Sequence, residues 1–230
     1  MVLMNRLATP ARAVLLLAVP VIMLSMPLYV FVTPGFVRYE YGLRGFPPST
    51  HFDTAERLRL SDTILHYLRG RASLEAMATM ATAQGEVALR DSETQHLVDV
   101  KVVTDGFFIA HGGAVVAAAL SLLILGFSSR RSLIPAALRQ GVFITGGVIL
   151  LLVMASFINF DVFFTRFHEV FFRADSWLFY EDDTLIQLYP LRLWQDAVWK
   201  IGAMVLLELG AVYGVSLALD RWPWMRAVSS

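Results

Sequence analysis

The chain has no cysteine and relatively few charged residues. Without cysteine it can form no disulfide, no thiolate metal site and no cysteine nucleophile, and it cannot carry a lipid on a cysteine of its own. Charged residues make up 17% of the sequence and hydrophobic residues 57%, against about 25% and about 45 to 50% in ordinary globular domains. Nineteen basic and nineteen acidic residues balance to a net charge of zero, which argues against a nucleic-acid partner. This composition indicates a membrane protein.

Several catalytic and ligand-binding motifs are also missing. The sequence holds no GxSxG nucleophile elbow, no HExxH zinc motif and no P-loop, and its five histidines are not paired at metal-ligand spacing. We therefore predict no metal and no cofactor. Histidines and carboxylates distant in the sequence can still meet in space as a metal site, so this alternative stays open at this stage.

Four segments are long and apolar enough to cross a bilayer as helices, at about 13–37, 106–127, 140–160 and 198–219. We predict an all-α polytopic membrane protein that forms a single membrane domain over residues 1–230. The first segment is too long for the apolar region of a secretory signal, so we expect an uncleaved anchor. Pro20, Pro27 and Pro34 should kink it.

The short segments outside these spans carry an excess of basic residues, which are retained on the cytoplasmic side. These residues are Arg6 and Arg12 before the first span, Arg130, Arg131 and Arg139 between the second and third, and Arg221 and Arg226 against Asp220 in the tail. Both termini are therefore predicted inside. The connections 38–105 and 160–200 then face outward from the cytoplasmic membrane, and we expect the active site there.

The first outer connection contains two predicted helices. Apolar residues at helical spacing between 53 and 68, with Gly70 as a stop, predict an amphipathic helix lying on the bilayer or on other spans. Ser92 and Gln95 have the form of a capping box, so we expect a second helix from Glu93 to about Val103.

His96 and Asp99 in this second helix lie three residues apart and share a face. A carboxylate that accepts from one imidazole nitrogen fixes the tautomer and raises the basicity of the other nitrogen, which prepares a histidine to act as a general base. The same spacing is common on solvated helix surfaces, so the alternative is a simple surface pair.

The second outer connection is rich in phenylalanine. Residues 157–179 hold half of the sixteen phenylalanines, several of them at helical spacing after the third span. Such a stripe often serves packing or interfacial anchoring. His168 lies within it, with Asp161 two turns earlier on roughly the same face. A histidine held where an acyl chain meets water could act on a lipid ester.

The other ionisable candidates have ordinary explanations. His51 and His66 are expected to be solvated, and His111 is expected to pack between helices or lie at the interface. Glu208 falls near the centre of the fourth span, where a carboxylate suggests a function, but a protonated side chain hydrogen-bonded to a neighbouring helix is the simpler explanation.

Residues 95–101 (QHLVDVK) and 160–172 (FDVFFTRFHEVFF), followed by Trp177, Asp183, Leu185-Ile186 and Pro190, resemble the lipoprotein intramolecular transacylase (Lit) family of bacterial integral membrane proteins. The resemblance covers the whole chain in topology and about sixty residues in motif. It implies that the sn-2 acyl chain of a diacylglyceryl-modified lipoprotein moves to the amine of the substrate's own N-terminal cysteine. The partners implied are that lipoprotein and membrane lipids.

With this chemistry the enzyme needs no nucleophile of its own, because amine and ester belong to one substrate molecule. We assign the acid and base roles to His96 and His168, without deciding which is which. Supporting roles are assigned to Asp99, Asp161 and Asp183, and contacts with the substrate to Lys101, Phe164, Phe167, Phe171 and Trp177.

Two other functions fit the same sequence. One is a non-enzymatic membrane protein that binds a lipid or protein partner through its outer connections. The other is a hydrolase that releases the acyl chain to water with the same two histidines. Transacylation and hydrolysis both require His96 and His168 to converge, so their separation in space discriminates the enzymes from the binding protein.

Overall fold

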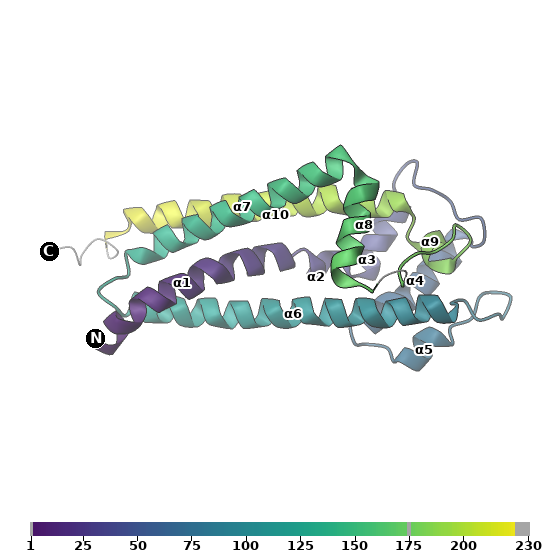
Figure 1. The fold of residues 1–230 in the computed structure, drawn as a ribbon, viewed down its shortest axis with the longest axis horizontal. Helices are drawn as coiled ribbons and strands as arrows, with labels where there is room; N and C mark the ends of the chain where they lie inside the picture. Colours follow the sequence, from purple (N-terminus) through teal and green to yellow (C-terminus); the bar gives the residue numbers. More distant parts are fainter. Residues whose placement is uncertain (1, 174–175, 224–230) are drawn as a thin grey trace. The chain divides into compact units, whose positions relative to one another are not determined.

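The computed structural model describes residues 2–173 and 176–223, which form helices joined by short connections (Figure 1). In chain order the helices are α1 (Val2–Ser25), α2 (Leu28–Phe31), α3 (Pro34–Tyr41), α4 (Thr54–Leu68), α5 (Leu74–Ala78), α6 (Asp91–Gly126), α7 (Leu133–Ile158), α8 (Phe160–Phe171), α9 (Thr184–Leu188) and α10 (Leu191–Arg221). Apart from one isolated bridge between Ala81 and Val87, the described residues form no β-structure. The predicted all-α class is confirmed.

Four helical stretches in the described part of the chain are long and apolar enough to cross a membrane. They are Val2–Phe31, Asp91–Gly126, Leu133–Ile158 and Leu191–Arg221. Each of the four predicted spans overlaps one of them, but the helices extend beyond the apolar segments at one or both ends. The number of membrane-spanning helices predicted from the sequence is therefore confirmed.

The chain divides into two compact units. The first, which we call the span unit, comprises Met1–Pro27, Phe108–Met154 and Ile201–Ser230. The second, the site unit, comprises Leu28–Phe107 and Ala155–Lys200. The site unit thus holds most of both predicted outer connections, together with His96 and His168.

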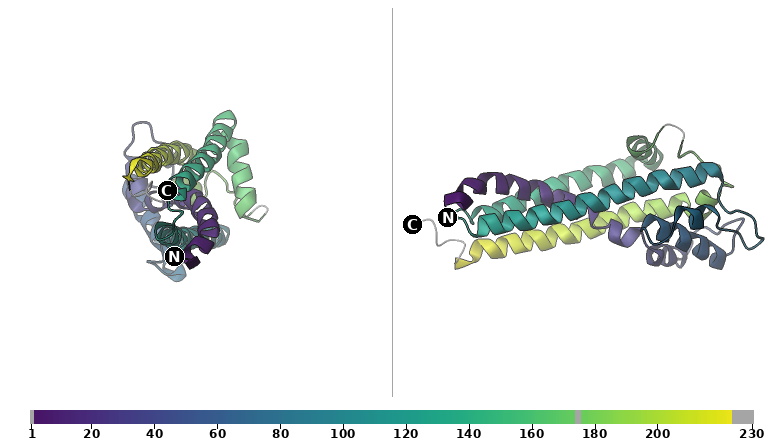
Figure 2. Two further views of the ribbon diagram at one scale, coloured as in Figure 1. Left: turned by 90° about the vertical axis from the view of Figure 1, so that its left-hand side faces the viewer. Right: turned by 90° about the horizontal axis from the view of Figure 1, so that it is seen from below.

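Four helix segments from α1, α6, α7 and α10 run side by side in the span unit (Figure 2). Polar side chains join them in pairs: Arg12 donates to the Gln140 side chain over 2.9 Å, and Arg139 forms an ion pair with Asp220. Buried apolar side chains of α1 pack with those of α6 and α7 in one cluster. These contacts hold the predicted spans together as a bundle.

Gly141 allows α7 to approach α1 closely. A Cβ atom at this position would lie only 2.6 Å from the Cβ of Val19 and 3.3 Å from the carbonyl oxygen of Leu16. No real side chain tolerates such a distance, so the helices reach this separation only because residue 141 is glycine. Small residues serve close helix packing in membranes in the same way.

His111 packs between helices, one of the two explanations given for it above. Its Nδ1 atom lies 2.9 Å from the Ser25 hydroxyl, which links α6 to the end of α1 within the span unit. A polar pair of this kind joins neighbouring helices where lipid offers no alternative partner.

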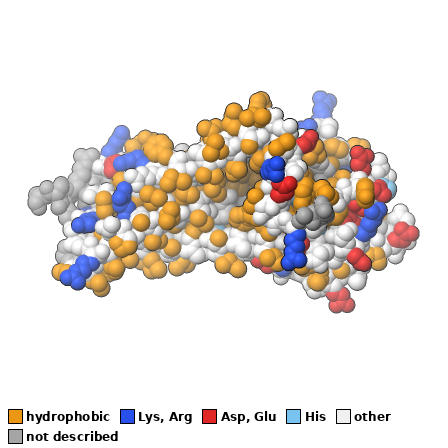
Figure 3. All heavy atoms as spheres, viewed as in Figure 1, with side chains coloured by type: hydrophobic (Ala, Val, Ile, Leu, Met, Phe, Trp, Pro, Cys, Tyr) orange, Lys and Arg blue, Asp and Glu red, His pale blue; other side chains and the backbone are white. Residues whose placement is uncertain are grey.

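Basic side chains of the span unit gather at one end, on the left of Figure 3, whereas apolar side chains cover its middle part. Arg130, in the connection between α6 and α7, donates to the Thr9 hydroxyl over 3.0 Å. The grouping follows the charge asymmetry of the sequence, and the orientation derived from it stays a prediction. Arg226, which contributed to that prediction, lies outside the described residues.

The amphipathic helix expected between 53 and 68 is present as α4. Asp53 caps it by accepting from the backbone N–H of Glu56 over 2.8 Å, and Gly70 follows its end with a φ of 68°. Its apolar face, with Leu60 and Ile64 fully buried, packs in the core of the site unit, against α3, α5 and α9. Of the two predicted alternatives, packing on other spans holds in part, because the same core includes Phe36 and Val37 from the end of the first predicted span. The face is buried within the protein and so does not lie on the bilayer.

The first predicted span is interrupted rather than merely kinked. Pro20 lies inside α1 without ending it, but α1 stops at Ser25 just before Pro27. A second break separates α2 from α3, where Pro34 takes the first helical position behind the cap Thr33. The segment 13–37 therefore includes parts of three helices, because proline supplies no N–H to continue the hydrogen-bond ladder.

The predicted helix from Glu93 to about Val103 and the second span form one helix, α6. It begins at Asp91, and the Glu93 carboxylate accepts from the backbone N–H of Arg90 over 2.9 Å. The capping residue is therefore Arg90, two positions before the predicted Ser92. Gly106 does not interrupt the helix, since a single glycine costs only about 1 kcal/mol in a helix interior.

Only part of α6 needs to lie in lipid. A span requires about 20 residues, and α6 has 36. The charged residues Asp99, Lys101 and Asp105 all precede Gly106, where the apolar run begins. We therefore place the membrane-spanning segment after Asp105 and treat the earlier turns of α6, with His96, as lying outside it.

Candidate active site

His96 of α6 and His168 of α8 lie next to each other in the site unit. Their ring centroids are 6.4 Å apart and the ring planes differ by 23°, so the imidazoles are stacked at a distance. His96 is 8% exposed and His168 is partly buried. The structure thus brings together the two residues to which the sequence assigned acid and base roles.

Local sequence signals place His168. The helix α7 ends at Ile158, and Asn159, in an extended conformation, caps α8 by accepting from the backbone N–H of Val162 over 3.0 Å. The phenylalanine stripe therefore lies on a separate short helix and does not continue the third span. His168 falls in the last turn of that helix.

Aromatic rings surround both histidines. The His168 ring has neighbours at centroid distances of 4.1 Å (Phe164), 4.8 Å (Trp177), 5.5 Å (Phe172) and 5.6 Å (Phe167). Phe172 is also 4.9 Å from His96, whose other aromatic neighbour is Phe179 at 5.3 Å. We call these two histidines and five aromatic side chains the histidine cluster. Its lining is apolar and matches an acyl chain in chemistry.

The hydrogen bonds fix one tautomer. His168 Nδ1 lies 2.7 Å from the carbonyl oxygen of Phe164. A carbonyl oxygen can only accept, so Nδ1 carries the proton and, in the neutral ring, Nε2 keeps its lone pair. For His96 the buried Nδ1 has no hydrogen-bond partner among the described residues.

Both imidazoles are held neutral near pH 7. The pKa of His96 is lowered to about 4, mainly by burial and also by the nearby His168, while the charge of Asp99 opposes the shift. Burial also lowers the pKa of His168, against the hydrogen bond to the Phe164 carbonyl, which raises it. Two neutral imidazoles can each accept a proton, which suits them to base catalysis.

Asp99 and Lys101 are both engaged with neighbours on α6. Asp99 accepts from the Gln95 side chain over 3.4 Å, and no hydrogen bond joins it to His96 within the described chain. Its effect on His96 is therefore electrostatic. Lys101 forms an ion pair with Asp105 at 3.0 Å and lies over the Tyr67 ring.

Asp161 and Phe171 lie farther from the histidine rings. Asp161 is exposed in the first turn of α8, and seven residues of helix separate it from His168, a rise of about 10 Å. Phe171 packs against Phe167 and Phe107, with ring centroids 4.9 and 5.7 Å away. It extends the aromatic surface without contacting either imidazole directly.

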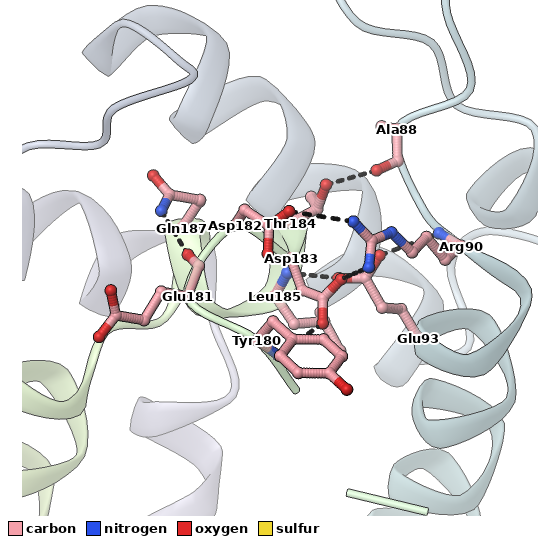
Figure 4. A network of polar contacts seen from close by, with 10 residues as sticks. All are labelled: Ala88, Arg90, Glu93, Tyr180, Glu181, Asp182, Asp183, Thr184, Leu185 and Gln187. Carbon is pink, nitrogen blue, oxygen red and sulfur yellow. Dashed lines mark hydrogen bonds and ion pairs between the residues drawn. The ribbon is translucent and has the colours of Figure 1, made fainter. Parts of the chain in front are cut away.

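Asp183 joins the stretch before α9 to the start of α6 (Figure 4). Its carboxylate lies 2.5 Å from the Arg90 guanidinium and accepts from the backbone N–H of Tyr180 over 2.7 Å. It occupies the cap position of α9 but makes no side-chain cap bond there. The support it gives is therefore to the connection that carries Trp177 and Phe179.

Glu93 is a supporting residue that the sequence did not reveal. Its side chain is fully buried and accepts from the backbone N–H groups of Arg90 and Leu185, over 2.9 and 2.7 Å. These bonds fix α9 to the first turn of α6, one turn before His96. A glutamate in the first turn of a helix is common, so nothing in the sequence distinguished it.

Phe179 was also missed as a neighbour of His96. It is the last phenylalanine of the second connection and follows no helical spacing, so periodicity gave no signal.

In the part of the chain that the structure describes, no three histidine or carboxylate side chains gather in a way that could hold a metal ion.

An all-helical chain with four helices able to cross a membrane, and with two histidines in an aromatic cluster, has the features of an integral membrane enzyme. Residues 12–194 match the sequence profile of the family described as Lipoprotein intramolecular transacylase Lit. The chain therefore belongs to the Lit family. At the level of that family it is a lipoprotein transacylase, with a lipoprotein substrate.

Similar proteins match most of the length of this chain. An uncharacterized protein of Aquifex aeolicus (strain VF5) is 28% identical over 204 residues, 88% of each chain. The solved structure of the membrane integral lipoprotein intramolecular transacylase Lit from Bacillus cereus matches with a TM-score of 0.77 at 18% identity, covering 94% of this chain and 98% of that one. A variant of that protein with a histidine replaced by alanine gives a TM-score of 0.73, with 93% of each chain covered.

Proposed function

We propose that this enzyme moves the sn-2 acyl chain of a diacylglyceryl-modified lipoprotein to the amine of the substrate's N-terminal cysteine, which leaves a lyso-form lipoprotein. The observation that carries the proposal is the contact of His96 and His168 within an apolar aromatic cluster. Two neutral bases beside a surface suited to acyl chains are the groups that aminolysis of a lipid ester requires.

The proton balance of the reaction matches two bases. At neutral pH the substrate amine is largely an ammonium, and the product amide keeps one of its three protons. One of the two protons lost goes to the departing glycerol oxygen and the other leaves to solvent. Two imidazoles that are neutral before the reaction can take both.

In the proposed sequence the deprotonated amine adds to the ester carbonyl carbon, and the carbonyl π electrons move to the oxygen. Collapse of this intermediate breaks the bond to the sn-2 glycerol oxygen, which takes a proton from an imidazolium. His168 presents the Nε2 lone pair because its Nδ1 proton is held by Phe164, so we assign it the role of base toward the amine. His96 takes the second proton from the nitrogen after it has added to the carbonyl carbon, and delivers that proton to the glycerol oxygen, while the proton on His168 leaves to solvent.

Placing amine and ester on one substrate molecule also supplies rate. An intramolecular attack avoids the entropy loss of bringing two molecules together, which is worth several kcal/mol when the geometry is right. The enzyme needs to fold the substrate so that nitrogen meets carbonyl carbon, and to exclude water. The aromatic lining of the histidine cluster suits both tasks, since it packs against acyl chains and carries few groups that hold water.

We further propose that the protein lies in the cytoplasmic membrane of a bacterium with both termini inside and the histidine cluster on the extracytoplasmic side. The basic residues of the short segments support this orientation. Diacylglyceryl-modified lipoproteins displayed on that side would reach the cluster from the outer leaflet.

The test is to express His96→Ala and His168→Ala in a strain that depends on this gene for lyso-form lipoprotein, and to read lipoprotein N-termini by mass spectrometry. We expect the diacylglyceryl form to remain with either variant. His51→Ala, which replaces an exposed histidine of the same unit, is the matched control and should yield lyso-form. Normal lyso-form from His96→Ala or His168→Ala would remove that residue from the mechanism.

A further inference from the structure

Trp177 holds an unused hydrogen-bond donor beside His168 in the histidine cluster. Its indole ring lies 4.8 Å from the His168 ring, with 33° between the planes. The indole Nε1 is shielded from solvent and has no hydrogen-bond partner within the described parts of the chain. An indole N–H donates but cannot accept, so only an acceptor can satisfy it.

A buried donor without a partner is unfavourable, and such groups are uncommon in folded proteins. Most of the surrounding side chains offer no acceptor, because the histidine cluster consists of phenylalanine rings apart from Trp177 and the two imidazoles. A polar group that enters with the acyl chain would meet this need. In the proposed substrate that group is the ester, whose carbonyl oxygen is its best acceptor.

The other N–H groups of the cluster are less suited to this task. The Nδ1–H of His168 already donates to the Phe164 carbonyl. The remaining imidazole nitrogens must accept and release protons during the reaction. Trp177 is the member of the cluster whose N–H is both uncommitted and unable to titrate.

We propose that Trp177 is a catalytic residue whose Nε1–H donates a hydrogen bond to the ester carbonyl oxygen as negative charge develops on it. The inference rests on the proposed acyl transfer. When the amine nitrogen adds to the carbonyl carbon, the π electron pair moves to the oxygen, and the indole N–H stabilises that oxyanion without transferring its proton. When the oxyanion collapses, the C–O bond to glycerol breaks and the hydrogen bond weakens again.

Preorganised donors of this kind act mainly on the chemical step, because the hydrogen bond is stronger to the oxyanion than to the ground-state ester. Loss of one oxyanion donor lowers kcat by about 10²–10³-fold in well-studied enzymes. We therefore expect Trp177→Phe to lower kcat roughly 100-fold while KM changes less than about threefold. Trp199→Phe, at an exposed tryptophan in ring contact with Phe157, is the matched control and should keep wild-type kcat.

The assay uses the full-length protein in detergent micelles with a synthetic diacylglyceryl lipopeptide, and the product is quantified by mass spectrometry. A second variant replaces Trp177 by β-(3-benzothienyl)alanine, which keeps the shape of the indole but has sulfur in place of N–H. The same loss of kcat, with an unchanged unfolding midpoint, would support the donor role. The benzothienyl variant also keeps the test valid if Trp177→Phe does not fold.

Wild-type turnover by the benzothienyl variant would overturn the proposal. A purely apolar role predicts instead a rise in KM that grows with the length of the acyl chain, and that result would also overturn it. The wild-type protein is measured in parallel, so that the two hypotheses fail separately. Absence of lyso-form from the wild type would contradict the proposed function, whereas an active wild type with an equally active benzothienyl variant would contradict the role of Trp177 alone.

Discussion

The Arg90 guanidinium lies 2.5 Å from the Asp183 carboxylate and so joins the residue before α6 to the residue before α9. The Asp183 side chain is 4% exposed, whereas that of Arg90 is 56% exposed. Because the same carboxylate accepts from the backbone of Tyr180, the pair also fixes the connection that carries Trp177 and Phe179. The contact therefore ties the aromatic side of the histidine cluster to the helix of His96.

Asp183→Ala should destabilise the site unit by about 2 kcal/mol, since a charge-assisted hydrogen bond contributes roughly 1.5–3 kcal/mol. Activity should fall as well, because Phe179 and Trp177 lose their support. The unfolding midpoint and the yield of lyso-form measure both effects. Asp182→Ala is the control: its contact with Arg90, at 3.3 Å, is exposed and should contribute less than about 1 kcal/mol. Equal effects of the two substitutions would contradict the supporting role assigned to Asp183.

Gly141→Val should destabilise the span unit, because even a Cβ atom at this position would lie 2.6 Å from the Val19 Cβ. We expect a loss of at least about 2 kcal/mol, in the range of overpacked interiors. Gly147→Val on the same helix meets nothing within 4 Å and serves as the control. Thermal unfolding in micelles compares the two variants. A midpoint for Gly141→Val as high as that of Gly147→Val would refute the close approach of α7 to α1.

The stability of the protein should depend on pH through His96. Burial holds its pKa at about 4 in the folded state, whereas an unfolded histidine titrates near 6.5. Between these values the unfolded chain binds a proton that the folded chain does not. The contribution of neutral His96 to the free energy of unfolding is therefore complete above about pH 6.5 and is lost as the pH falls through the folded pKa. The loss amounts to about 3 kcal/mol.

The comparison of His96→Phe with the wild type isolates this effect from other titrating groups. We expect the unfolding midpoint of the wild type to fall more steeply between pH 7 and pH 4 than that of His96→Phe. His51→Phe should follow the wild type, since His51 is exposed. Parallel curves for wild type and His96→Phe would show that His96 is not held neutral by burial.

The absence of cysteine allows a direct test of orientation. Single cysteines at two exposed positions, Gln84→Cys in the site unit and Ser132→Cys between α6 and α7, would be the only thiols in the chain. We expect a membrane-impermeant maleimide added to whole cells to label residue 84 and not residue 132. Labelling of residue 132 alone would show the opposite orientation, with the histidine cluster on the cytoplasmic side.

Much of the helical architecture could be predicted because it depends on local sequence. Apolar length determined the positions of the four spans, and the spacing of apolar residues such as Leu60 and Ile64 predicted α4. The boundaries were less predictable. The break at Asn159 and the continuity of α6 through Gly106 depend on single residues whose preferences are weak compared with the packing around them.

The candidate site was predictable only in part. Composition and motif pointed to His96 and His168, but their contact depends on how α8 packs near α6, which no local pattern specifies. The role of Glu93 was hidden for the same reason, because it accepts from Leu185, a residue more than ninety positions away. Lys101 was favoured by motif alone, and in the structure it pairs with Asp105.

The most direct test of the proposed acyl transfer follows one acyl chain. A synthetic diacylglyceryl lipopeptide carrying an isotope label only in the sn-2 acyl group is incubated with the full-length enzyme in micelles made up in H₂¹⁸O. We expect the label to appear entirely in the amide on the N-terminal cysteine, and we expect His96→Ala and His168→Ala to leave it on glycerol. Release of the labelled chain as a free fatty acid containing ¹⁸O would mean hydrolysis and would contradict the proposed acyl transfer.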